Sequence, residues 1–280
     1  MNPGKKRPVS ARRTRRALLR LGTVLAASAA GFGTPARAVD DAKPTLWLIG
    51  DSTVNNGTRG QMGWGKPLAA LFDLAKIKVE NRARGGRSSR TYFTEGLWDQ
   101  VLAAIKPGDF LLIQFGHNDG GPLTGGTGRA SLKGNGDEVR EITHPTTGKP
   151  ESVHSFGWYL RRYLADARAR GATGIVLSPV PRNIWKEGRV ARAANDYGKW
   201  AAEAAKLAGA PFIDLNELVA KRYEEAGEAR VAAEYFGPTD HTHTLAAGAD
   251  VNAAAVAAGI RALEGCPLRG YLAGPSPNRE

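Results

Sequence analysis

The amino-acid sequence predicts one α/β domain in which helices cover both faces of a parallel sheet. Short apolar runs alternate along the chain with segments that carry apolar residues every three or four positions. The first pattern is typical of buried strands and the second of helices that pack one face on a core, and their alternation is typical of βαβ units. After an N-terminal segment of different composition, about 240 residues remain, which is the length of one domain.

Five segments are predicted to be the strands of this sheet. The clearest are TLWLIG at 45–50 and FLLIQFG at 110–116, because long apolar runs are typical of parallel strands buried on both faces. In chain order, the five predicted strands are 45–50, 77–81, 110–116, 174–180 and 211–215.

Six segments between and after these strands are predicted to be helices. Leu68, Leu71, Phe72 and Ala75 would share one face of the first helix, as their spacing requires. In chain order, the predicted helices are 65–75, 95–105, 156–169, about 190–207, 217–225 and 246–263. Residues 119–153, rich in Gly, Thr and Pro, are expected to form a long irregular loop of functional or mobile character. The tail 273–280 is expected to be frayed.

The N-terminal segment 1–38 is predicted to be an export signal that is cleaved, leaving 39–280 as the domain. It contains nine Lys and Arg residues, no Asp or Glu, a mildly apolar stretch, and the small-x-small sequence ARA at 36–38. TRRALLR at 14–20 resembles the twin-arginine export motif. We therefore expect a periplasmic or secreted protein with no membrane attachment after cleavage. A basic disordered tail and an uncleaved anchor are the alternatives, although the apolar stretch is shorter than the roughly 20 residues of a spanning helix.

The formal net charge of +12 is largely a property of this segment. The 39 Lys and Arg residues of the chain include the nine in 1–38, so 30 remain against 27 Asp and Glu. Without a recognition motif or a basic domain, the sequence does not indicate a nucleic-acid partner. A single cysteine, Cys266, excludes a disulfide within the chain.

Polar residues follow three of the predicted strands. Ser52 comes two positions after the strand 45–50, and Asn118 comes two positions after the strand 110–116. Residues 178–183 lie at the carboxyl end of the strand 174–180 and just past it. Because ligands of open parallel sheets bind beyond the carboxyl ends of the strands, these segments should meet at one edge. Taken locally, the Ser in GDST is equally compatible with a turn.

Four blocks together resemble the SGNH hydrolases, also called the GDSL esterase family. They are GDST at 50–53, NRARGGRSSR at 81–90, GHND at 116–119 and DHTH at 240–243. The sequences GRSSRTYFTEG, FGHNDGG, YGKWAAEAAKLAG and DHTHT are similar to the rhamnogalacturonan acetylesterase branch, and the likeness covers most of 45–264. The resemblance implies a flavodoxin-like three-layer αβα fold with a five-stranded parallel sheet, a serine mechanism, and neither a metal nor a cofactor.

The same residues suit a Ser-His-Asp mechanism on chemical grounds. A serine hydroxyl becomes a good nucleophile when a base removes its proton, which assigns Ser52 as nucleophile and His243 as base. Asp240 lies three residues before His243, so its carboxylate can reach the other ring nitrogen and fix the tautomer. A metal site built from Asp240, His241 and His243 is the alternative, but it needs a further ligand that the sequence does not identify.

The family pattern supplies three oxyanion donors: the backbone N–H of Ser52, the backbone N–H of Gly86, and the side-chain amide of Asn118. Glycine suits a place where the backbone approaches a substrate closely. Gly85 leaves the register open by one residue, and Gly86 is chosen because it precedes Arg-Ser. Gly86 and Asn118 could also be ordinary turn residues.

The predicted function is that of an exported esterase removing O-acetyl groups from a plant cell-wall polysaccharide, with pectin or rhamnogalacturonan favoured. Arg87, Arg90 and Arg182 are candidate substrate-binding residues, because guanidinium groups pair well with the carboxylates of galacturonate. Arg87 and Arg90 could instead pair with acidic residues of the protein. The alternatives are an esterase for xylan acetate or other short acyl esters, and a non-catalytic polysaccharide-binding protein on an esterase fold.

Overall fold

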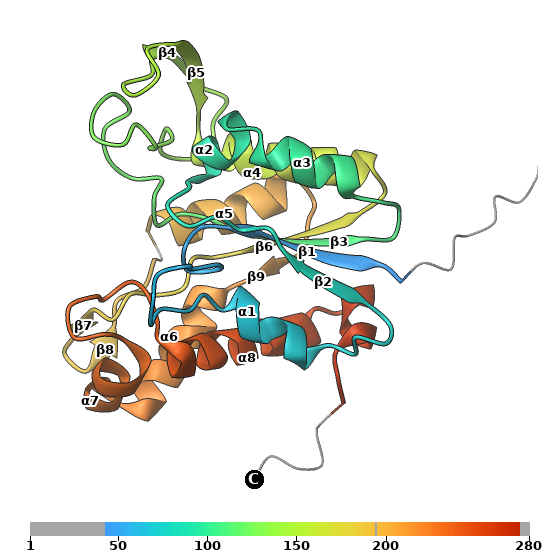
Figure 1. The fold of residues 1–280 in the computed structure, drawn as a ribbon, viewed down its shortest axis with the longest axis vertical. Coiled ribbons are helices and arrows are strands. Elements are labelled where there is room, and N and C mark those ends of the chain that lie inside the picture. The colour runs from blue at the N-terminus through green and yellow to red at the C-terminus, as the bar shows by residue number, and fades with distance from the viewer. Residues whose placement is uncertain (1–42, 194, 275–280) are drawn as a thin grey trace, which may run out of the picture. The chain divides into compact units, whose positions relative to one another are not determined.

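The structure is a computed structural model that describes residues 43–193 and 195–274. The predicted signal 1–38 and most of the predicted frayed tail lie outside the described residues. A five-stranded parallel sheet has the strand order β2-β1-β3-β6-β9 (Figure 1). The strands are β1 Thr45–Gly50, β2 Lys78–Asn81, β3 Phe110–Gln114, β6 Thr173–Leu177 and β9 Phe212–Ile213. The predicted five-stranded parallel sheet is confirmed.

Alternate residues of each strand point to opposite faces of the sheet and supply two separate cores. Leu46 and Leu48 belong to one buried cluster, whereas Trp47 and Ile49 belong to the other. This alternation follows from the two-residue period of a strand. The register pairs Leu48 with Leu112 and Ile49 with Ile113, so neighbouring strands repeat it. Both faces are therefore apolar, as the long apolar runs in the sequence predicted.

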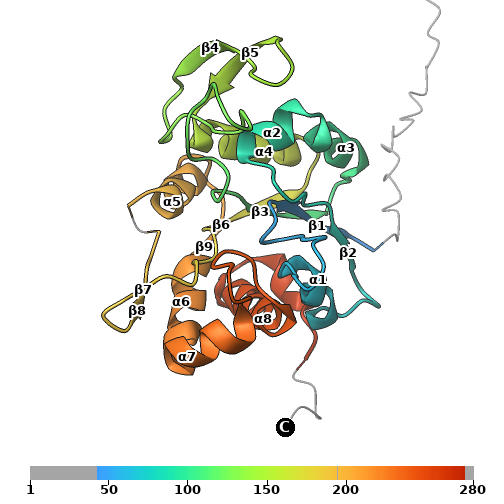
Figure 2. The same cartoon turned by 60° about the vertical axis from the view of Figure 1, so that its left-hand side comes forward.

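Helices cover both faces, which confirms the three-layer αβα arrangement (Figures 1 and 2). The helices beside Leu48 are α1 Gly65–Leu68, α6 Leu215–Ala226 and α8 Ala246–Ala262, with the short α7 Glu228–Arg230 following α6. The helices beside Ile49 are α2 Ser89–Thr94, α3 Leu97–Ala104, α4 Phe156–Ala169 and α5 Tyr197–Leu207. Among the described residues, no helix has the length and apolar character needed to cross a membrane.

The predicted helix 65–75 is shorter in the structure. Helix α1 continues only into a 3-10 turn at Ala69–Leu71, and the backbone is extended at Phe72. There the chain pairs with a distant segment, since Asp73 N donates to Tyr271 O at 2.8 Å and Ala273 N donates to Leu71 O at 2.9 Å. These tertiary hydrogen bonds end a helix that the apolar spacing alone would have continued.

Two other segments also correct the sequence prediction. The predicted helix 190–207 begins only at Tyr197, and a small hairpin of β7 Trp185–Lys186 and β8 Arg189–Val190 precedes it. The segment 119–153, expected to be irregular, contains most of a second hairpin, β4 Val139–Thr143 with β5 Pro150–His154. Strand β4 is mostly exposed, so it lacks the apolar alternation by which a strand is recognised.

Candidate active site

The structure brings Ser52, His243 and Asp240 into one hydrogen-bonded chain. Ser52 lies in the turn that follows β1, and His243 lies in the loop before α8. The Ser52 Oγ is 2.8 Å from His243 Nε2, and His243 Nδ1 is 2.7 Å from Asp240 Oδ2. A carboxylate only accepts, so Nδ1 donates to it and Nε2 is left to accept the proton of the serine hydroxyl.

Hydrogen bonds from its own turn hold the Asp240 carboxylate in place. Its Oδ1 accepts the backbone N–H groups of Thr242 at 2.7 Å and His243 at 2.9 Å. Burial raises the pKa of Asp240, but the bonds from His243 and Thr242 outweigh burial and hold the pKa well below its usual range. The carboxylate is therefore ionised at neutral pH, and it stabilises a positive charge on His243.

Gln61 is a further contact of Asp240 that the sequence did not reveal. Its Nε2 donates to Asp240 Oδ2 at 2.9 Å, and its Oε1 accepts from Asn56 Nδ2 at 2.9 Å. Gln61 and Asp240 are 179 positions apart, so no local pattern links them. The loop after GDST thus supports the Asp240 carboxylate in addition to the turn that contains Asp240.

Asp51 and His117 fix the turn that carries Ser52. Buried Asp51 accepts the backbone N–H of Thr53 at 2.9 Å and its hydroxyl at 2.7 Å. The second oxygen of Asp51 is 3.3 Å from His117 Nδ1, and His117 Nε2 donates to Val180 O at 3.0 Å. Burial raises the pKa of Asp51, but His117 and Thr53 outweigh burial and lower it. His117 thereby joins the ends of β1, β3 and β6.

The predicted oxyanion residues lie around the same point. Gly86 has a φ of +79°, a conformation that favours glycine, while a Cβ on Gly85 would stand 3.6 Å from the Ser52 Cβ. The Asn118 Nδ2 donates to Arg87 O at 2.9 Å, so this amide lies against the same loop. The structure thus brings together Ser52, the glycine pair and Asn118, and Asn118 retains a second N–H.

Asp119 forms hydrogen bonds at the end of the loop that contains Gly85 and Gly86. Ser89, the first residue of α2, donates its backbone N–H to Asp119 Oδ1 at 3.1 Å, and the Ser131 hydroxyl donates at 3.0 Å. Burial raises the pKa of Asp119 to about 6, against the lowering effect of these bonds. Helix α2 itself begins with a capping box between Ser88 and Thr91. Asn118 precedes Asp119 in the sequence, so the hydrogen bond that Ser89 donates to Asp119 holds Asn118 close to the loop that contains Gly85 and Gly86.

Two of the three candidate arginines bind carboxylates of the protein. Arg90 is fully buried and donates to both oxygens of Glu151, at 2.7 and 2.8 Å. The prediction that Arg90 contacts substrate is therefore wrong, because its charge is already paired inside the molecule. The Arg87 Nε is 2.8 Å from Glu95 Oε2, but its side chain is 38% exposed. Arg182 is half-buried and donates to the hydroxyl of Thr242, in the turn between Asp240 and His243.

The DHTH turn is not arranged as a metal centre. Both ring nitrogens of His243 already contact protein groups, and His241 is exposed. Within 43–193 and 195–274, no group of three or more His, Cys, Asp or Glu residues is placed to hold a metal ion.

The sequence has well-defined relatives. The family model described as the GDSL-like Lipase/Acylhydrolase family matches residues 48–251. Rhamnogalacturonan acetylesterase of Emericella nidulans is 36% identical over 207 residues, which cover 74% of this chain and 80% of that protein. The probable rhamnogalacturonan acetylesterase YesY of Bacillus subtilis is 33% identical over 228 residues, covering 80% of this chain and 94% of that protein.

Solved structures have the same fold. The protein YXIM of Bacillus subtilis matches with a TM-score of 0.63 and 26% identity over 79% of this chain, which spans 56% of that longer structure. A variant of Axe2, an acetyl-xylooligosaccharide esterase of Geobacillus, matches with a TM-score of 0.50 and 17% identity, covering 79% of this chain and 95% of that one. The likeness to Axe2 shows the fold alone. With its family model matching most of its length, the chain belongs to the GDSL-like lipase/acylhydrolase family, whose members are ester hydrolases.

Proposed function

We propose that the protein is an exported carbohydrate esterase that removes O-acetyl groups from plant cell-wall polysaccharide, with rhamnogalacturonan as the favoured substrate. The observation that carries the proposal is the chain of contacts from Asp240 through His243 to the Ser52 hydroxyl. Relatives named as rhamnogalacturonan acetylesterases, at 36% and 33% identity, support the acetyl ester of a carbohydrate as the substrate.

The contacts support a two-step mechanism. His243 Nε2 takes the hydroxyl proton of Ser52 as Oγ attacks the acetyl carbonyl, and it returns that proton to the sugar oxygen when the C–O bond breaks. Ser52 then carries the acetyl group. A water molecule, deprotonated by the same nitrogen, attacks the acetyl-enzyme, and acetate leaves as the proton returns to Ser52. Asp240 holds the imidazole and stabilises its positive charge in both steps.

Three donors are proposed to stabilise the oxyanion of each tetrahedral intermediate. They are the backbone N–H groups of Ser52 and Gly86 and the second N–H of Asn118, whose first N–H binds Arg87 O. That bond fixes the amide plane before substrate arrives, so little reorganisation remains for the reaction. The loss of one such donor typically costs about 2.7–4 kcal/mol of transition-state stabilisation.

Substitution of the nucleophile and of the two histidines tests the proposal. Ser52→Ala and His243→Ala should each lower acetate release from an acetylated rhamnogalacturonan by about four to six orders of magnitude, because these groups act as one unit. His241→Ala is the matched control and should retain most of the activity, since His241 is exposed. More than about a tenth of the parent rate in Ser52→Ala would contradict the mechanism. A parent protein that binds the polymer but releases no acetate would favour the non-catalytic alternative.

The preference for an acidic polymer rests on Arg182 and Arg87 near the proposed nucleophile. A guanidinium group pairs with the carboxylate of galacturonate, whereas neutral xylan offers no carboxylate. Added salt should therefore raise KM for acetylated rhamnogalacturonan and leave KM for a small neutral acetyl ester nearly unchanged. Faster deacetylation of acetylated xylan than of acetylated rhamnogalacturonan at low salt would show that xylan is the preferred substrate. The assignment as an esterase would be unaffected.

A further inference from the structure

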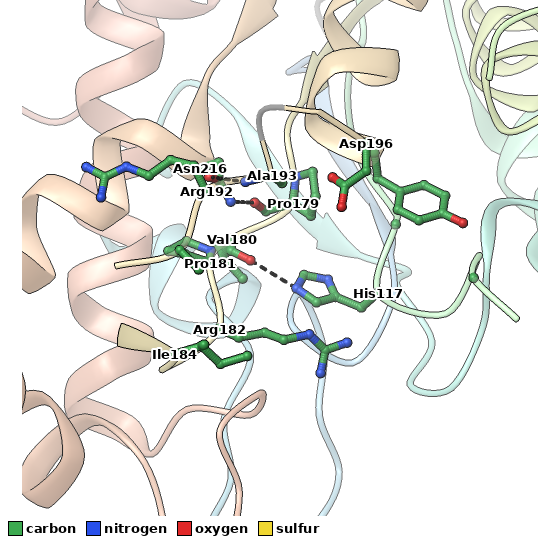
Figure 3. A pocket seen from close by; sticks show the side chains of 14 residues that line it. His117, Pro179, Val180, Pro181, Arg182, Ile184, Arg192, Ala193, Asp196 and Asn216 are labelled. Atoms are coloured by element: carbon green, nitrogen blue, oxygen red, sulfur yellow. Dashed lines mark hydrogen bonds between the residues drawn. The ribbon is translucent and has the colours of Figure 1, made fainter. Parts of the chain in front are cut away.

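A pocket of about 310 Å³ is lined by residues that include His117, Pro179, Arg182 and Asp196 (Figure 3). It lies beyond the carboxyl ends of β3 and β6, where open parallel sheets bind their ligands. Its size is at the lower end of the roughly 300–1,000 Å³ that small-molecule pockets occupy. Its wall includes His117, Pro179, Pro181, Arg182, Ile184 and Asp196.

Hydrogen bonds join the wall of this pocket to the residues that precede the proposed nucleophile and the proposed base. His117 in its wall contacts Asp51, the residue before Ser52. Arg182 in its wall donates to Thr242, the residue before His243. An occupant of the pocket would therefore neighbour the group that is bound at Ser52, without occupying the place of the acetyl group itself.

Asp196 is an exposed residue of the pocket wall. It is the N-cap residue of α5, where an aspartate side chain normally accepts a backbone N–H of the first helical turn. Its side chain makes no such bond, and its carboxylate has no hydrogen bond or ion pair with any described residue. In the view of Figure 3, Asp196 lies on one side of the His117 ring and the Arg182 guanidinium on the other. The pocket thus has an acceptor end and a donor end.

The other polar side chains of the wall are already bonded or lack a partner altogether. Arg192 binds Glu217 and Glu224, and Asn216 donates to Pro179 O and accepts from Ala193 N. By contrast, the hydroxyl of Tyr197 is buried without a hydrogen-bond partner among the described residues. Because solvent does not reach that hydroxyl, an occupant would not reach it either, which leaves Arg182 and Asp196 as its polar contacts.

We propose that this pocket is a subsite for a hexuronate residue that belongs to the same polymer chain as the acetylated sugar and lies close to it. The inference rests on the proposed function. The carboxylate of the uronate pairs with Arg182, two ring hydroxyls donate to the Asp196 carboxylate, and the C–H face of the ring packs on Pro179, Pro181 and Ile184. Because the cation and the anion stand at opposite ends, the ring is held in one orientation, and this places the acetylated sugar at Ser52.

Equilibrium binding to the full-length Ser52→Ala protein tests the subsite without any need for turnover. The probes are a deacetylated tetrasaccharide of alternating galacturonate and rhamnose, and xylotetraose, each titrated calorimetrically. Asp196→Asn and Arg182→Gln, each added to Ser52→Ala, should weaken binding of the galacturonate probe about tenfold, because each removes a hydrogen bond to a charged group. Arg182→Gln should leave the weaker binding of xylotetraose unchanged.

The matched controls are Asp250→Asn and Arg261→Gln, which replace exposed side chains of α8 and should leave both affinities unchanged. Parent-like thermal unfolding midpoints would show that the pocket variants are folded. Parent-like binding of the galacturonate probe by Asp196→Asn, or no binding of it at millimolar concentration by Ser52→Ala, would overturn the subsite. An equal loss with both probes in Arg182→Gln would overturn the uronate assignment. Acetate release by the parent protein is measured separately, so the failure of the subsite is distinguishable from failure of the esterase.

Discussion

The Asp240 carboxylate is supported by its own turn and, from outside that turn, by Gln61. The Gln61 amide draws negative charge away from the oxygen that also binds His243 Nδ1. Without it, more charge faces the imidazole, and its protonated form becomes easier to form. Gln61 is therefore a positioning residue for the proposed base and also one that tunes its proton affinity.

Gln61→Ala should lower kcat on a small acetyl ester about tenfold, in line with the roughly 1.5–3 kcal/mol of a hydrogen bond to a charged group. It should leave KM nearly unchanged and move the acidic limb of the kcat profile to higher pH. Gln61→Glu should move that limb further, because it adds a second carboxylate beside Asp240. The control is Gln100→Ala, an exposed glutamine of α3. A lower kcat without a shift of the pH profile would contradict this role and would mean that Gln61 only supports the local structure.

Asp119 gives a second prediction at the scale of a single residue. Its folded-state pKa of about 6 lies above the roughly 3.9 of an unfolded aspartate. Between these values only the folded chain holds the proton, so this group contributes stability at low pH and loses it as pH rises toward 6. The loss amounts to about 1.4 kcal/mol per pH unit within that window.

Asp119→Asn cannot titrate, so its free energy of unfolding should fall less than that of the parent between pH 4 and pH 6. Urea unfolding at several pH values measures the difference, with the exposed Asp99→Asn of α3 as the control. Parallel pH curves for Asp119→Asn and the parent would show that the pKa of Asp119 is ordinary.

Among single residues, side-chain contacts were predictable from the sequence where the two partners are close together in the chain, or where the residues belong to a motif shared with a known family. The spacing of Asp240 and His243 fixed their pairing, because three residues of one turn bring the two side chains together. The partners of Arg90 and Gln61 are 61 and 179 positions away, and only the folded chain brings them into contact. Arg90 was misassigned for this reason, and Gln61 was missed.

At the scale of elements, the Arg90–Glu151 pair ties the hairpin β4–β5 to helix α2. Glu151→Ala would leave the fully buried guanidinium without its counter-charge, and breaking a buried pair costs about 3–5 kcal/mol. Urea unfolding should show a loss of that order, while the exposed Glu225→Ala of α6 changes little. Arg90→Met combined with Glu151→Ala should recover part of the loss, because no buried charge is then left alone. A loss below about 1 kcal/mol in Glu151→Ala would mean that water solvates Arg90.

The elements themselves were predictable where local signals decide them. Helix α4 has the predicted bounds, with the Ser155 side chain accepting the Trp158 N–H at its start. The helix expected at 65–75 ends early because a segment some 200 residues later along the chain supplies its hydrogen-bond partners at Leu71 and Asp73. Tertiary pairing of this kind leaves no trace in a local apolar pattern.

At the scale of the whole molecule, the two cores that the described residues form extend from Leu46 to Leu268 in the sequence. If 1–38 is a cleaved export signal, as proposed, the mature protein keeps every residue of these two cores. A protein that starts at Val39 should unfold at the same temperature as the full chain, within about 2 °C, and hydrolyse a small acetyl ester at the same rate. Scanning calorimetry and initial rates check both expectations.

The export proposal itself is tested in a host that has both secretory routes. N-terminal sequencing of the exported protein should begin at Val39, and replacing Arg15 and Arg16 with Lys should retain the precursor inside the cell. Unchanged export of that variant would rule out the twin-arginine route.

The proposed nucleophile and its base are separated by 191 positions, and four of the five strands of the sheet are encoded between them. During synthesis, Ser52 therefore leaves the ribosome long before His243 exists, and until then its hydroxyl is as inert as that of any surface serine. The last helix, α8, must pack on α1 before the two side chains can meet. In the proposed mechanism, activity therefore begins only when the chain is complete, and a truncated product of interrupted translation that lacks His243 would not hydrolyse acetyl esters inside the cell that makes it.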